Sequence, residues 1–274
     1  MTTVATAAVP RARFTDLLAA EWIKIQSLRS TPWILGAVTL TVLVTAALAA
    51  WSDYQDIPRL DADARREHVF SLGDAFPAEG YLVLMLAAGS VGAIVVVSEY
   101  GSGLIRTTTA AVPARRSLML AKAAVTALLW TGVGLLCALG SFAVSQAILS
   151  GRGAAVSLTD PGALRALAAS ALLAPVSALT GFGLGVLIRH GATTMVASAF
   201  VLLMLPMFFG SREPWVERAR NMMVQSAWQR LVTLYGWGPD AYGGATVAGS
   251  WTVFAVWPLA AVALALIVVR RRDV

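Results

Sequence analysis

The stretch Ala123–Leu149 reads AAVTALLWTGVGLLCALGSFAVSQAIL, 27 residues without a single Lys, Arg, Asp or Glu. A helix needs about 20 apolar residues to cross the hydrocarbon core of a bilayer. Five more uncharged stretches of 17 residues or more occur at Trp33–Trp51, Tyr81–Val97, Ala166–Ile188, Ala192–Phe209 and Trp251–Val269. The sequence therefore predicts an all-α, polytopic membrane protein with six transmembrane helices.

The composition favours the same fold class. Of the 274 residues, 58% are hydrophobic and only 13% are charged, whereas a soluble domain averages about 25% charged residues. We expect residues 1–13 to form a disordered cytoplasmic tail and residues 14–274 to form one transmembrane domain. The first apolar stretch has no small-residue cleavage site close behind it, so we interpret it as a retained helix and not as a signal peptide.

The charges alternate between the two sides of the predicted membrane. With both termini placed in the cytoplasm, the inner segments hold twelve of the 21 Lys and Arg but only four of the 15 Asp and Glu. This excess predicts an N-in, C-in topology, and it relates the net charge of +6 to membrane lipids and not to nucleic acid. The predicted inner-leaflet anchors are Arg115, Arg116, Lys122, Arg270, Arg271 and Arg272. The outer loop 210–250 departs from the pattern, because it contains Arg212, Arg218, Arg220 and Arg230.

Residues 14–29 predict an amphipathic helix that lies in the membrane interface. Its apolar face consists of Phe14, Leu17, Leu18, Trp22, Ile25 and Leu28. Glu21 falls inside this face, where a carboxylate without a partner is costly. Two interpretations stay open: Glu21 reaches water or pairs locally with Lys24, or it forms a salt bridge with a cytoplasmic loop or a partner.

Two further patterns concern packing. The outer loop 210–250 contains a predicted helix over Pro214–Leu234, and we expect it to lie in the outer leaflet with its tryptophans, Trp228 included, in an interfacial aromatic belt. The motif Gly181-x-x-x-Gly185 in the fourth span permits close helix approach. It predicts either ordinary packing within the chain or a dimer face that moves.

Several motifs of energy conversion and catalysis are missing from the sequence. The only two lysines, Lys24 and Lys122, do not follow a glycine, so there is no phosphate-binding P-loop. His68 and His190 lie in loops, and Cys137 is the only cysteine, which excludes an intrachain disulfide and suggests a small packing residue. No acid lies within a span, although proton-coupled transporters usually need one there. We therefore expect neither enzymatic activity nor a cofactor in this chain, and any work must be powered by another protein.

The first inner loop reads SEYGSGLIRTTTAAVPARR over residues 98–116. Glu99 ends the second span, and Leu104–Ala111 predicts a short helix that stops before Pro113. From the residues alone, a plain basic turn is an equally good interpretation.

This loop, together with the opening segment AEWIKIQSLRS over residues 20–30, resembles permease subunits of bacterial type-2 ABC exporters. The resemblance extends over the whole chain, from an amphipathic connecting helix (14–29) through six spans to a basic tail. It implies a separate ABC ATPase subunit that binds ATP and Mg, and a second permease copy, either identical or a paralogue. It also implies that the coupling loop 98–117 docks on the ATPase.

The resemblance further implies roles for individual residues. The ATPase-docking residues would be Glu99, Leu104, Ile105, Arg106, Thr107 and Thr108, and those of the connecting helix Glu21, Lys24 and Arg29. The outer loop 210–250 would be a partly re-entrant cap, and the cargo an amphipathic drug, peptide or lipid-like molecule. Richness in Ala, Arg and Gly is typical of a GC-rich bacterial genome, so we expect the bacterial cytoplasmic membrane as the location.

Two other classes of function stay open. One is a stand-alone secondary transporter or channel, which would carry a flux without an ATPase. The other is a non-transporting membrane sensor or assembly factor, which would show no substrate-dependent ATPase activity in any complex.

Overall fold

The computed structural model describes residues 13–27, 29–60, 71–101, 115–210, 213–233 and 245–271, and within these ranges all regular structure is helical. Six helical segments in them are long and apolar enough to cross a membrane. These segments are Thr31–Arg59, Leu72–Tyr100, Arg115–Ser150, Ala163–Ile188, Gly191–Phe208 and Val247–Arg270. The predicted fold class, an all-α polytopic membrane protein, is confirmed.

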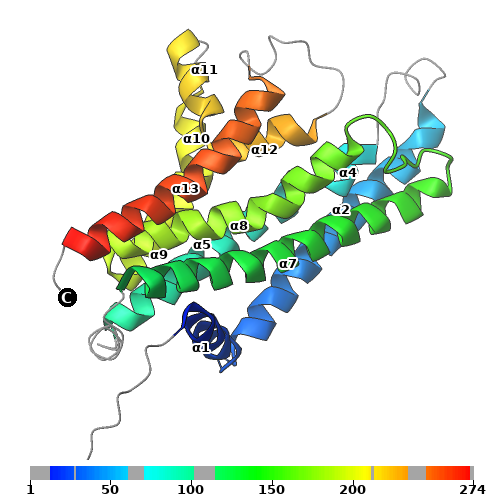
Figure 1. The fold of residues 1–274 in the computed structure, drawn as a ribbon. Coiled ribbons are helices and arrows are strands. Elements are labelled where there is room, and N and C mark those ends of the chain that lie inside the picture. The colour runs from blue at the N-terminus through cyan, green and yellow to red at the C-terminus, as the bar shows by residue number, and fades with distance from the viewer. Residues whose placement is uncertain are drawn as a thin grey trace, which may run out of the picture.

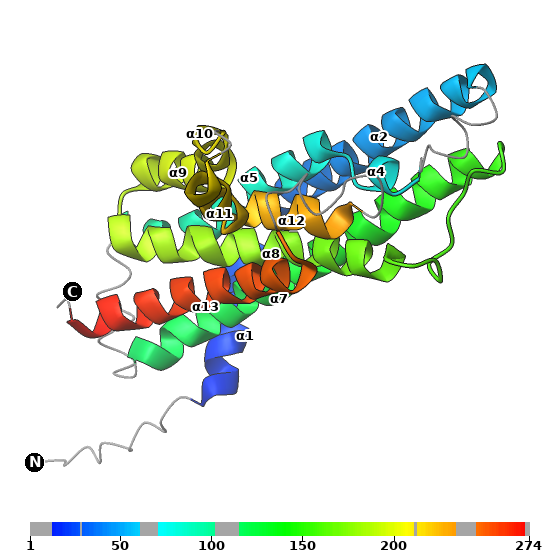
Figure 2. The same ribbon diagram turned by 90° about the horizontal axis from the view of Figure 1, so that it is seen from above.

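The long helices run side by side as a tilted bundle (Figure 1). They are α2 (Thr31–Asp56), α5 (Ala78–Gly101), α7 (Arg115–Ser150), α8 (Ala163–Ile188) and α13 (Val247–Arg271). Short helices η1 (Ile57–Arg59) and α4 (Ser71–Ala75) lie between α2 and α5 in the chain. The ends of α5, α8 and α13 and the start of α7 gather at one end of the bundle, where α1 (Phe14–Ser27) lies across α7 (Figures 1 and 2). This end carries the cations Arg115, Arg116 and Arg270, so the positive-inside rule predicts that it faces the cytoplasm, and we call it the cytoplasmic end.

Helix α8 is the centre of the bundle and contacts α5, α7 and α13 through small residues. Each contact contains a glycine. If that glycine were replaced by alanine, the new Cβ would overlap the facing helix or press closely against it. The contacting pairs are Gly181 with Gly89 and Gly185 with Ala93 on α5, Gly183 with Ala261 on α13, and Ala171 with Gly134 on α7. The Gly181-x-x-x-Gly185 motif therefore serves packing within the chain, as one of the two interpretations predicted.

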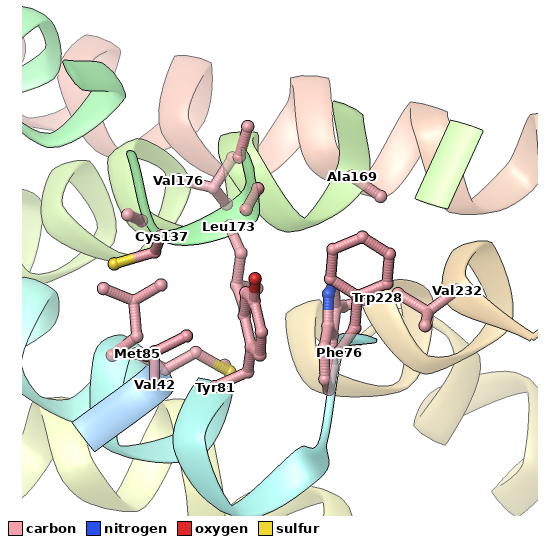
Figure 3. Packing of buried hydrophobic residues seen from close by; sticks show 14 of the residues in the cluster. Val42, Phe76, Tyr81, Met85, Cys137, Ala169, Leu173, Val176, Trp228 and Val232 are labelled. Carbon is pink, nitrogen blue, oxygen red and sulfur yellow. The ribbon is translucent and has the colours of Figure 1, made fainter. Parts of the chain in front are cut away.

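An aromatic cluster fills the core toward the outer end of the bundle (Figure 3). Trp228 of α12 (Val224–Val232) is only 1% exposed, stacks on Tyr81 at 5.1 Å between ring centroids, and donates its indole N–H to Ser170 Oγ at 3.1 Å. Placing Trp228 in an interfacial belt was wrong, because α12 turns inward and buries this ring. The lone Cys137 is buried in the same cluster, as a packing residue.

The outer segment forms two helices, not the single predicted helix over Pro214–Leu234. Helix α11 (Pro214–Asn221) ends at Met222, and Met223 adopts an extended backbone before α12 begins. The indole N–H of Trp257 binds the carbonyl of Met222 at 2.8 Å, so one carbonyl at the break has a partner. At the other end of α12, the Arg165 guanidinium donates to the carbonyls of Leu231 and Thr233, at 3.0 and 3.1 Å.

The fifth span is also interrupted. It consists of α9 (Gly191–Ala199), a π-helical turn (Phe200–Met204) and α10 (Leu205–Phe208). Pro206 has no N–H to donate to the preceding turn, and the N–H of Leu205 binds the carbonyl of Phe200 instead, five residues back. The predicted apolar range is correct, but the helix within it widens where the proline removes a donor.

Candidate functional site

The cytoplasmic end is built on the first two turns of α7. This helix has 36 residues and is about 54 Å long, well beyond the hydrocarbon core of about 30 Å. The first turns of α7, which precede the predicted span, carry Leu118 and Ala121. These two residues pack with Leu17 and Leu18 of α1. The apolar face predicted for the amphipathic helix therefore docks on α7, although Phe14 and Trp22 at its margins stay exposed.

Four charged side chains meet beneath this contact, and we call them the charge cluster: Glu21, Lys24, Glu99 and Lys122. Lys122 Nζ lies 2.6 Å from Glu21 Oε2 and 2.8 Å from Glu99 Oε1. Lys24 Nζ lies 2.7 Å from Glu21 Oε1 and 2.9 Å from the same Glu99 oxygen. Two acids thus alternate with two bases, and the formal charges cancel. The cluster joins α1, the last turn of α5 and the start of α7.

Burial divides the charge cluster into two parts. Glu21, Glu99 and Lys122 are at most 6% exposed, whereas the side chain of Lys24 is 43% exposed. Removing one partner of a buried ion pair costs about 3–5 kcal/mol, because the remaining charge loses its compensation. An exposed pair contributes only about 0–1 kcal/mol. Lys122 is therefore the energetic centre of the cluster, and Lys24 covers it on the water side.

Burial also acts on the charge of Lys24. It disfavours the ammonium form, but hydrogen bonds and charge attraction from Glu21 and Glu99 outweigh it and raise the pKa of Lys24 above its ordinary value. Lys24 is therefore charged throughout the physiological range.

The structure brings together some of the predicted site residues. Both interpretations of Glu21 hold in part, since Glu21 pairs locally with Lys24 and also forms a salt bridge with Lys122 of α7. The prediction that Lys122 is a lipid anchor was wrong, because its ammonium is buried between two carboxylates. The connecting helix is described over Phe14–Ser27, Leu28 lies outside the described residues, and Arg29 lies in a turn.

Other predicted residues lie apart from the charge cluster or outside the described residues. At the cytoplasmic end, the side chains of Arg29, Arg116 and Arg270 are exposed. The side chain of Arg115 is half-buried. Outside the described part of the chain lie the docking residues Leu104, Ile105, Arg106, Thr107 and Thr108, the anchor Arg272, and the side chain of Arg271.

Arg189 is a residue that the sequence reasoning missed. It ends α8 in a left-handed conformation with φ 60°, which is uncommon for a residue other than glycine. Its guanidinium lies 4.7 Å from the centre of the Tyr100 ring, a cation–π distance. Tyr100 follows Glu99, so the end of α8 also bears on the last turn of α5. The only sequence signal was an arginine directly after an apolar span.

The ion pairs of the charge cluster join three helices at this end of the bundle. In the described ranges, no group of three or more His, Cys, Asp or Glu side chains is placed to hold a metal ion. The charge cluster instead fixes both flanks of the loop 102–114 to one another and to α1.

The chain was compared with known proteins, and neither a protein-family model nor a curated protein matches it.

Proposed function

We propose that this chain is the membrane subunit of an ATP-driven exporter of the type-2 ABC class. In this proposal a separate ATPase supplies the energy, two copies of the permease form the pathway, and the cargo is an amphipathic drug, peptide or lipid-like molecule. The location is the cytoplasmic membrane of a bacterium.

The observation that carries the proposal is the charge cluster. It spans both flanks of the inner loop, through Glu99 on one side and Lys122 on the other, and it adds Glu21 of α1. Because separating a buried pair costs about 3–5 kcal/mol, the three helices are expected to move as one body. Such a body is what a docking loop needs in order to pass the closure of an ATPase to the spans.

The distribution of charge along the sequence supports an external energy source. The chain has no P-loop, and its only two lysines both belong to the charge cluster. The apolar stretches contain no acid that could relay protons. Neither ATP hydrolysis nor proton coupling has a recognisable apparatus in the sequence.

In this proposal Leu104–Ala111 is the coupling helix, with Arg106 as its charged contact to an acidic surface of the ATPase. In this proposal the charge cluster, whose members Glu99 and Lys122 flank the loop in sequence, transmits the push. Lys24 of α1 and Arg29, which lies in the turn before α2, have exposed side chains at the same end of the bundle, and in this proposal they add contacts to the ATPase.

The test begins with co-expression of the full chain and the ATPase encoded nearest to its gene. A complex should co-purify, and its ATPase activity in nanodiscs should exceed that of the ATPase alone. Arg106→Glu should abolish this stimulation while the chain still inserts and purifies. Arg106→Lys, which keeps the charge, is the matched control and should retain most of it.

Other results would favour the other classes. Substrate flux in liposomes that hold this chain alone would support a secondary transporter or channel. A stable complex whose ATPase activity ignores every amphipathic substrate would support a sensor or assembly factor. If ATP-driven transport survives both Arg106→Glu and deletion of Leu104–Ala111, the docking assignment is wrong.

A further inference from the structure

Two oppositely charged side chains at the cytoplasmic end keep buried atoms without a hydrogen-bond partner. In Arg189 these atoms are Nε and Nη2, and in Glu99 the atom is Oε2. Among the described residues, the only other charged side chain with such an atom is Asp74 of α4, at the outer end of the bundle (Figure 1). A buried donor or acceptor left unpaired costs free energy, so such groups are normally paired in native proteins. The unpaired atoms of Arg189 and Glu99 are complementary, because the nitrogens donate and the oxygen accepts.

Glu99 uses only one of its two carboxylate oxygens in the charge cluster. Lys24 Nζ and Lys122 Nζ both donate to Oε1, at 2.9 and 2.8 Å. An ionised carboxylate has about four acceptor positions on its two oxygens. Oε2 can therefore accept from a third cation while both lysines keep their present bonds.

The guanidinium of Arg189 contacts an aromatic ring in place of an acid. Its Cζ atom lies 4.7 Å from the centre of the Tyr100 ring. In the described part of the chain, the guanidinium makes no hydrogen bond and no ion pair. Nε and Nη2 lie on the same edge of this planar group, and arginine uses such an edge for parallel hydrogen bonds to a carboxylate. The edge best suited to a carboxylate is thus the edge that lacks a partner.

One aromatic side chain separates the two unpaired groups. Tyr100 follows Glu99 directly, so their Cα atoms are about 3.8 Å apart, and their side chains leave α5 about 100° apart around its axis. Glu99 points toward α1 and α7, and Tyr100 points toward the end of α8. The end of α8 also packs against this part of α5, since Gly185 lies against Val96, one turn before Tyr100.

We propose that the cytoplasmic end has two arrangements and that Tyr100 selects between them. In the arrangement that the structure describes, the guanidinium of Arg189 stacks on the Tyr100 ring. In the other arrangement it leaves the ring, swings around the last turn of α5 and donates to Glu99 Oε2, while Lys24 and Lys122 keep Oε1. The second arrangement adds α8 to the three helices that the charge cluster joins. It is a property of this chain alone and does not depend on the proposed transport function.

The cost of removing Arg189 distinguishes this exchange from simple stacking. Arg189→Gln is made in the wild type and together with Tyr100→Leu, and the Tm of the full, detergent-solubilised chain is measured. If the guanidinium only stacks, Tyr100→Leu makes Arg189→Gln less costly, because the contact is already lost. In the proposed exchange, the released guanidinium pairs with Glu99. Arg189→Gln should then lower the Tm by about 5 °C more in the Tyr100→Leu chain than in the wild type.

This extra loss should depend on the Glu99 carboxylate. When Glu99→Gln is added to Tyr100→Leu, Arg189→Gln should cost no more than in the wild type. Tyr100→Phe, which keeps an aromatic ring, is the matched control and should leave the cost of Arg189→Gln unchanged. Arg270→Gln removes an exposed cation at the same end and should cost the same in every background, within about 1 °C.

Two results would overturn the proposal. One is a cost of Arg189→Gln that stays the same or falls when Tyr100→Leu is present. The other is an extra cost that survives Glu99→Gln. The first comparison leaves the charge cluster intact, so it decides between exchange and stacking even where Glu99→Gln prevents folding.

Discussion

Replacing Lys122 by methionine tests the charge cluster most directly. Methionine keeps most of the apolar stem of lysine and removes only the ammonium. The carboxylates of Glu21 and Glu99 then remain buried, at 2% and 6% exposure, with only Lys24 as a counter-charge.

The expected loss follows from this burial. Breaking a buried ion pair by removing one partner costs about 3–5 kcal/mol. For a domain of this size each kcal/mol lowers the Tm by about 2–4 °C, so Lys122→Met should lower it by about 10 °C. Lys24→Met removes the same group from a 43% exposed position, and should lower the stability by only about 0–1 kcal/mol.

The measurement is thermal unfolding of the detergent-solubilised chain, read as the monodisperse fraction after heating. A third variant combines Lys122→Met with Glu21→Gln and Glu99→Gln, which removes the stranded charges. Because the buried part of the cluster then carries no charge, and the remaining ammonium of Lys24 is 43% exposed to water, this variant should recover most of the lost Tm. Equal losses for Lys122→Met and Lys24→Met, or no recovery in the combined variant, would refute the reasoning.

Three further predictions concern packing and pH. Gly181→Ala places a Cβ against a backbone carbonyl of α5 and should cost about 1–3 kcal/mol, whereas Gly132→Ala, in open space, should not destabilise; both are measured by the same heating assay. Trp228→Ala should cost about 3–5 kcal/mol because the ring is buried, whereas Trp215→Ala, at 67% exposure, should change the Tm little. The raised pKa of Lys24 means that its ion pairs stabilise the fold below the ordinary value of 10.5 and lose that effect as pH rises through the raised value. The Tm difference between the wild type and Lys24→Met should therefore stay constant to about pH 10 and shrink above it.

The spans could be predicted because each is set by a local property, the length of an uncharged apolar run. The third span, Ala123–Leu149, lies wholly within α7, and the fourth matches α8 at its C-terminal end. The close helix contact at Gly181 could also be predicted from the sequence. Small residues four apart leave room on one helix face for another helix, and this does not depend on which helix packs there.

The parts that could not be predicted depend on contacts between distant residues. Lys122 and Glu21 are 101 positions apart, and Lys122 had the appearance of an interfacial anchor at the start of a span. Its burial follows only from the docking of α1 on α7. Trp228 likewise fits an interfacial belt by composition, and its burial depends on the extended backbone at Met223 that turns α12 inward.

The central place of α8 has a consequence for the order in which the chain is assembled. A nascent chain enters the membrane from its N-terminus, so α2, α5 and α7 are inserted before their common partner exists. The helix surfaces at Gly89 and Gly134, which lack a side chain, have no helix to pack against until α8 is inserted and places Gly181 and Ala171 opposite them. Insertion and packing are thus separate stages, and α5 and α7 gain these small-residue contacts only once α8 has been inserted.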